Sequence, residues 1–197
     1  MRARRGQVAD ARLTDFSAVT GVAAFTAWLG AALIVLADGR RGLALGLALV
    51  AAAFAVLAVA DGDALAAVAL LAGGGVAAVQ RVRSGTNDWG LMPPGSTSRL
   101  VLVIAAGVIA LWIATSVTTG ADAPLRFAAL AALGLLGARA LTGRDPAVVL
   151  TAIAGMGLTV AMVAGLAETN PGLVPYIVAA LITAGLSILP IGQTRGA

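Results

Sequence analysis

Arg139 is the charged residue that lies deepest within an apolar segment of this sequence, about one helical turn inside the end of the stretch 124–142. A charge inside a membrane helix costs several kcal/mol, so an arginine in such a place is a candidate functional group. Its long apolar stem also allows the guanidinium to reach the membrane surface, where the residue would be only an interfacial anchor. The sequence leaves both interpretations open.

Three threonines are the other candidates, because they place hydroxyl groups near the middle of apolar segments. Thr151 and Thr159 share one segment, and Thr183 lies in the next. If the two segments pack together, these hydroxyls would line a thin hydrated path between the two helices. A threonine in a helix can instead return its hydrogen bond to the carbonyl four residues earlier, which leaves no free donor. Arg139 and the three threonines are therefore the predicted site residues.

Other chemistry has little support in the sequence. The chain has no histidine and no cysteine, which removes the usual ligands of haem, iron–sulfur clusters and zinc. It has no serine-hydrolase, phosphate-loop or dinucleotide motif, and the run Asp61-Gly62-Asp63 is typical of a turn. We therefore predict no catalytic residue, no metal and no cofactor, and no enzyme activity for the chain on its own. Membership of an enzyme complex stays open.

The composition indicates a membrane protein. Of the 197 residues, 60% are hydrophobic and only 11% are charged, and the mean hydropathy is +0.99. An ordinary soluble domain is about 25% charged. The apolar residues fill whole segments of about 20 residues, the length of helix that crosses a hydrocarbon core of roughly 30 Å. The sequence therefore predicts an all-α protein in contact with a lipid bilayer.

The predicted fold is a polytopic transmembrane helix bundle with seven spans in a single domain, residues 17–190. A basic N-terminal tail, 1–16, precedes it, and a C-terminal tail, 191–197, follows it. The spans are expected near 17–37, 42–60, 64–80, 99–118, 124–142, 146–166 and 172–190. Asp145 and Ser98 are expected N-caps, and Pro175 is expected to kink the last span. The alternative is six spans, with the first apolar segment lying in the membrane interface.

The charges of the connections alternate in sign. Arginines mark the first, third and fifth connections, and acids mark the second, fourth and sixth. By the positive-inside rule the arginine ends and the C-terminus face the cytoplasm of a prokaryotic cell, so the membrane would be a bacterial inner membrane. Four arginines of the N-terminal tail would then lie outside. The arginines stand apart from any aromatic platform or basic stripe, so no nucleic-acid partner is predicted despite an isoelectric point of about 11.3.

Small residues recur at three- and four-residue spacing within the spans. The runs are Gly42 and Gly46, Gly73 to Gly75, Gly134 with Ala138, and Gly157 with Ala161 and Gly165. Such faces let helix backbones approach closely in lipid, within one chain or between partners. A high content of Ala and Gly also follows from codon usage in a GC-rich genome, and that alternative stays open. The aqueous segment 81–98, which contains Trp89, is suited to docking against another subunit.

The stretch TGRDPAVVLTAIAGMGLTVAM, residues 142–162, resembles the second helix of the K subunit of respiratory complex I. Residues 124–190 resemble the helix trio of that subunit and of membrane component E of group 4 hydrogenases. The resemblance implies a place beside antiporter-like subunits of an ion-translocating complex. That family carries proton-path glutamates in its second and third helices, where this chain has Ala154 and Leu181. A glutamate proton path is therefore not implied for this chain.

Taken with the lack of charge near the middle of the spans, these features predict a non-catalytic integral membrane subunit of a larger complex, of the respiratory or hydrogenase-type ion-translocating kind. Other membrane subunits, antiporter-like ones among them, are the expected partners. The alternative is a small transporter or substrate-binding membrane module for an apolar or neutral solute. Many transporters have helices that are broken near the membrane midplane, and no span is visibly interrupted there in this sequence.

Overall fold

The computed structural model describes residues 2–83, 89–91, 96–116, 122–167 and 172–189, and the chain forms seven α-helices within them. The helices are α1 (Arg2–Leu36), α2 (Arg40–Ala60), α3 (Ala64–Arg83), α4 (Thr97–Ser116), α5 (Ala123–Thr142), α6 (Pro146–Ala167) and α7 (Val174–Ile188). Within this part of the chain the predicted all-α fold is confirmed, and one isolated β-bridge joins Ala37 to Leu91.

Six of these helices, α1 to α6, are long and apolar enough to cross a membrane. In α1 the candidate span is its C-terminal part, Ser17–Leu36. The seventh helix, α7, is apolar but has only 15 residues, which corresponds to about 22 Å at 1.5 Å per residue. Six of the seven predicted spans are thus confirmed in length and composition, and the seventh apolar segment forms a shorter helix.

The first apolar segment belongs to the bundle. Helix α1 packs against both α2 and α5, and Ala27, Ala31 and Ile34 on its inner side are completely buried. This packing places Ser17–Leu36 in the bundle with the other long helices, and the count of six long apolar helices arises from the short α7 instead. The helix begins at Arg2, so residues 2–16 of the predicted tail extend α1.

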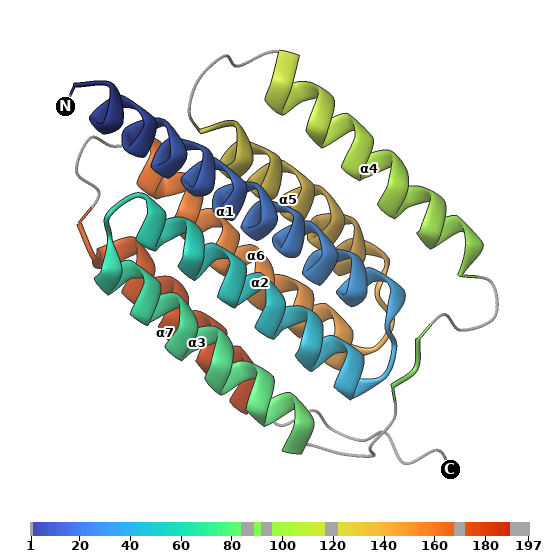
Figure 1. Ribbon diagram of the computed structural model, residues 1–197. Coiled ribbons are helices and arrows are strands. Elements are labelled where there is room, and N and C mark those ends of the chain that lie inside the picture. Colours follow the sequence, from blue (N-terminus) through green and yellow to red (C-terminus); the bar gives the residue numbers. More distant parts are fainter. Residues whose placement is uncertain (1, 84–88, 92–95, 117–121, 168–171, 190–197) are drawn as a thin grey trace, which may run out of the picture.

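The bundle has two layers of three helices with one helix at the side (Figure 1). Helices α1, α2 and α3 form one layer, and α5, α6 and α7 form the other. The pairs α1 and α5, α2 and α6, and α3 and α7 face each other across the layers. Helix α4 connects the two layers in sequence and packs beside α5, with weaker contact to α1 (Figure 1). This arrangement leaves α4 as the least enclosed of the long helices.

Glycines set the spacing of several helix pairs. A Cβ atom on Gly46 of α2 would lie 2.7 Å from the carbonyl oxygen of Gly30 in α1, and one on Gly73 of α3 would lie 2.5 Å from the Cα of Ala180 in α7. Neither site has room for a side chain, so the predicted small-residue contacts are confirmed there. Gly75 and Gly134 face open space, with no atom within 4 Å of a built Cβ. Small size alone therefore does not show which glycines make contacts.

The helix ends follow local capping rules, with two differences from expectation. Asp145 caps α6, because its Oδ1 accepts the backbone N–H of Ala147 at 2.8 Å. Ser98 is not the N-cap of α4, because that helix already begins at Thr97. Pro175 lies in the first turn of α7, where its missing N–H has no helical partner to lose, so it produces no kink.

Candidate functional site

Arg139 lies in the last turn of α5 and is almost completely buried, with 4% of its surface exposed. Its Nη2 donates a hydrogen bond to the carbonyl oxygen of Ala37 at 3.2 Å and another to the Oδ1 of Asp38, with which it forms an ion pair. Both partners follow α1 directly. The guanidinium therefore joins the end of α5 to the connection between α1 and α2, rather than extending freely into the membrane surface.

A second arginine binds the same carboxylate. The Nη1 of Arg99, in the first turn of α4, donates to both carboxylate oxygens of Asp38 at 3.0 and 3.1 Å. Asp38 thus connects α1, α4 and α5 at one end of the bundle. Asp38 could not be identified from the sequence, because the run Asp-Gly-Arg-Arg-Gly in which it lies is typical of a turn. Its partner Arg139 is also 101 residues away, so no local pattern links the two.

The connection between α3 and α4 also folds onto this end. The backbone N–H of Asp38 donates to the carbonyl of Gly90 at 3.0 Å, and Ala37 forms a β-bridge with Leu91. Gly90 has a φ of +47° and lies against the backbone of Gly39, which leaves no room for a side chain. The described part of the predicted docking segment 81–98 therefore contacts the chain itself, while its residues 84–88 and 92–95 lie outside the described residues.

A polar pocket of about 410 Å³ opens beside these ion pairs. It is lined by Asp38, Arg99, Arg139, Thr142, Arg144, Asp145 and Val148. Among the described lining residues, three arginines and two aspartates leave one net positive charge. The pocket therefore places guanidinium groups around a space at one end of the membrane-spanning helices.

The three predicted threonines lie elsewhere and are fully buried. The hydroxyls of Thr151 and Thr159 donate to the carbonyls four residues earlier, at 2.6 and 2.8 Å. The hydroxyl of Thr183 donates across the helix interface to the carbonyl of Ala154 in α6, at 3.2 Å. Each of the three hydroxyls thus donates its hydrogen bond to a backbone carbonyl. Arg139 instead contacts the α1–α2 connection, so these contacts do not join the four predicted site residues.

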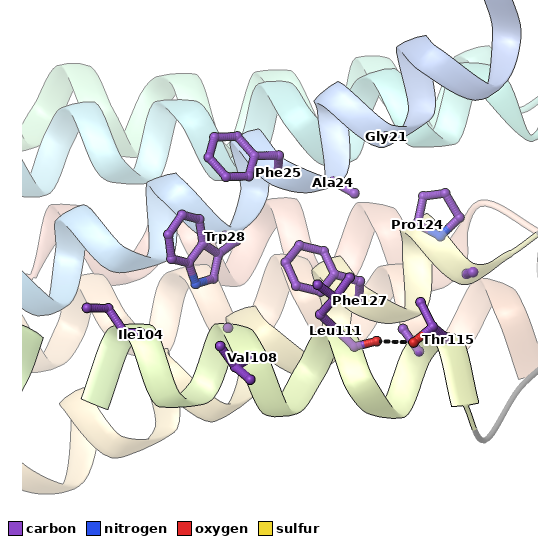
Figure 2. A pocket seen from close by; sticks show the side chains of 13 residues that line it. Gly21, Ala24, Phe25, Trp28, Ile104, Val108, Leu111, Thr115, Pro124 and Phe127 are labelled. Atoms are coloured by element: carbon purple, nitrogen blue, oxygen red, sulfur yellow. Dashed lines mark hydrogen bonds between the residues drawn. The ribbon is translucent and has the colours of Figure 1, made fainter. Parts of the chain in front are cut away.

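An apolar groove of about 550 Å³ runs between α1, α4 and α5, on the open side of the bundle (Figure 2). Gly21, Ala24, Phe25 and Trp28 line it from α1, and Ala123, Pro124 and Phe127 line it from α5. Helix α4 contributes Ile104, Gly107, Val108, Leu111, Ala114 and Thr115. Among the described lining residues only Thr115 carries a hydroxyl, and that hydroxyl already donates to the carbonyl of Leu111 at 2.8 Å (Figure 2). The groove therefore suits apolar occupants.

The sequence of α4 explains why the groove stays open. Its buried residues form one narrow stripe, Val103, Gly107, Ala110 and Ala114, while most of its large apolar residues are exposed. Trp28 of α1 fills the contact at Gly107 and donates from Nε1 to the carbonyl of Val103 at 3.4 Å. Beyond this contact α1 and α4 lie apart (Figure 2). The ring of Phe25 packs against that of Trp28 in a tilted arrangement, with the ring centroids 5.2 Å apart.

The opposite end of the bundle carries acids. Gly62 has a φ of +89°, and the Oδ1 of Asp63 accepts the N–H of Ala66 at 2.9 Å, so the predicted turn at Asp61-Gly62-Asp63 is confirmed. Partial burial, and then the negative charge of Asp122, raise the pKa of the Asp61 carboxyl above its ordinary value. The acidic connections α2–α3 and α4–α5 therefore lie near each other, away from the arginine end.

Comparison with models of known protein families, with curated proteins and with solved structures finds no match. Six long apolar helices in a two-layered bundle, with ion pairs at the helix ends, make this chain a polytopic integral membrane protein.

Proposed function

We propose that this chain is a non-catalytic membrane subunit of a larger complex, of the respiratory or hydrogenase-type ion-translocating kind. The observation that carries the proposal is the apolar groove beside α4, where a helix with a narrow buried stripe stands partly away from the bundle. Without water to drive association, membrane helices pair by close packing, and an open groove between helices accepts the side chains of a neighbouring helix. Antiporter-like membrane subunits are the partners we propose.

The resemblance of residues 124–190 to the complex I K subunit supports this kind of complex. In the structure, Ala154 is buried and accepts the hydroxyl of Thr183, and Leu181 is 67% exposed on the outside of α7. Neither position holds an ionisable group, so this chain would support neighbouring subunits rather than carry protons along that path. Thr151, Thr159 and Thr183 serve helix packing in this proposal.

The proposed orientation places the arginine end in the cytoplasm of a prokaryotic cell. Arg40, Arg41, Arg99 and Arg144 lie at or next to helix ends on that side, whereas Asp61, Asp63 and Asp122 lie at the other end. The positive-inside rule supports this direction. It also places the beginning of α1 outside the cell.

The second candidate is a binding module for an apolar or neutral solute, and the same groove favours it. Its volume falls within the range of about 300 to 1,000 Å³ that is usual for small-molecule sites, and the rings of Phe25, Trp28 and Phe127 lie in its lining. In this function the groove would hold a single apolar molecule instead of a protein helix. The two functions therefore predict different occupants of the groove in protein that has been extracted from its native membrane.

Purification in a mild detergent from the membranes of the source organism separates them. The subunit function predicts that the chain elutes at constant stoichiometry with large multi-helix membrane proteins, and that Val108→Trp, which fills the groove, releases it. Val68→Trp is the matched control, because Val68 is equally exposed on α3 but does not line the groove. Elution as a lone, monodisperse protein that carries a small apolar molecule would instead establish the second function.

A further inference from the structure

The polar pocket at the arginine end has donors that the ion pairs do not use. A guanidinium offers five N–H donors, and the hydrogen bonds of Arg139 to Ala37 and Asp38 both leave from its Nη2. Its Nε is buried and has no hydrogen-bond partner among the described residues. A buried N–H without an acceptor costs about 1–3 kcal/mol, so this donor indicates a missing partner.

Arg144 adds a second set of donors. It lies just after α5, lines the same pocket and is exposed, and no ion pair to it occurs within the described part of the chain. The two acids of the pocket are already engaged, since Asp38 accepts from Arg99 and Arg139 and Asp145 caps α6. The described lining of the pocket therefore has spare donors and one net positive charge, the properties of a site for an oxyanion.

The position of the pocket agrees with a phosphate group at the membrane surface. Arg99 lies at the start of one candidate span and Arg139 near the end of another, so both belong to the boundary between hydrocarbon and water. Phospholipid phosphates lie at this level, and basic pockets between transmembrane helices bind their headgroups. Planar guanidinium groups match the paired oxygens of a phosphate better than ammonium groups do.

We propose that the pocket of Arg99, Arg139 and Arg144 binds a phosphate-type oxyanion, supplied by the headgroup of an anionic phospholipid or by free phosphate. The donors of Arg139 that its bonds to Ala37 and Asp38 leave unused and the guanidinium of Arg144 donate to the oxyanion, while Asp38 holds Arg99 and Arg139 in place. Such binding does not depend on whether the chain has protein partners.

The test uses the full-length protein in an uncharged maltoside detergent and a phosphate-free buffer. One arm titrates phosphatidylglycerol and counts bound lipid by native mass spectrometry. The other arm measures the unfolding temperature in inorganic phosphate against chloride at equal ionic strength. Arg144→Gln removes a donor without disturbing an ion pair, and Arg83→Gln is the matched control, because Arg83 is exposed at the same end but does not line the pocket.

Whichever probe binds, phosphatidylglycerol or inorganic phosphate, Arg144→Gln is expected to weaken its binding by about tenfold, the effect of losing one charge-assisted hydrogen bond. Arg139→Lys, which keeps the charge but has fewer N–H donors, is expected to weaken it similarly, and Arg83→Gln is expected to leave it unchanged. Binding of phosphatidylglycerol alone would identify a lipid headgroup site, and a phosphate-specific stabilisation would identify a site for the free ion. Equal affinities in wild type and Arg144→Gln, equal losses in Arg144→Gln and Arg83→Gln, or no binding of either probe would overturn the proposal.

Discussion

Asp38→Ala is expected to destabilise the protein by about 3 kcal/mol, because it leaves Arg139 as a buried charge without a counter-ion. The value lies at the lower end of the range for broken buried pairs, since the Asp38 side chain is itself 40% exposed and water partly replaces it. The same change removes the ion-pair partner of Arg99, but the guanidinium of Arg99 is partly exposed and is solvated by water more readily than that of Arg139. Thermal or denaturant-induced unfolding in detergent, followed by helical circular dichroism, measures the loss.

Two further variants separate the ion pair from other effects of the substitution. Adding Arg139→Met to Asp38→Ala removes the buried charge and replaces it with an apolar side chain, so most of the lost stability should return. Asp61→Ala at the opposite end removes a largely exposed carboxylate for which the described residues show no ion pair, and it should change stability by less than about 0.5 kcal/mol. If the double variant is no more stable than Asp38→Ala, the ion pair does not hold this end together.

Gly73→Ala is expected to destabilise the protein by about 2 kcal/mol, within the range for overpacking a close contact. The added methyl would lie 2.5 Å from the Cα and 2.9 Å from the carbonyl oxygen of Ala180, and backbone atoms cannot move aside as the tip of a side chain can. Helices α3 and α7 would have to separate along their whole contact. Unfolding temperature in detergent is the measurement, together with the yield of folded protein.

The neighbouring Gly75 supplies the control. A methyl there meets no atom within 4 Å, so Gly75→Ala should leave the packing unchanged and stabilise the helix by about 0.5–1 kcal/mol through its propensity. The two substitutions are chemically identical and two residues apart on one helix. Equal effects on stability would show that α3 and α7 do not approach as closely as the structure places them.

The helices were predictable because their signals are local. The predicted helix 146–166 ends one residue before the observed helix Pro146–Ala167. The agreement is close because a capping aspartate and a proline mark the start of this helix and an unbroken apolar run sets its length. The prediction of 64–80 stops three residues before the observed end at Arg83, because arginine ends an apolar run without ending a helix. Helix bounds therefore follow from composition, with errors at the charged ends.

The site was predictable only in part. Arg139 stands out as a charge inside an apolar segment, but its partner Asp38 belongs to another helix connection, and no local pattern joins residues 101 positions apart. The groove beside α4 was not predicted, because the apolar sequence of α4 resembles that of enclosed helices such as α6. Which apolar face is buried depends on how small residues on different helices meet, as Gly73 and Gly75 illustrate.

Site-specific photo-cross-linking from the groove tests the proposed role most directly. A benzophenone amino acid replaces Val108, which lines the groove, or Val68, which is equally exposed on α3 and does not. The cross-linker is activated in the membranes of the source organism. We expect the Val108 position to link to one antiporter-like membrane subunit and the Val68 position to link only to lipid. Links to lipid or to a small apolar molecule alone at Val108 would contradict the account of this chain as a subunit that works through its neighbours.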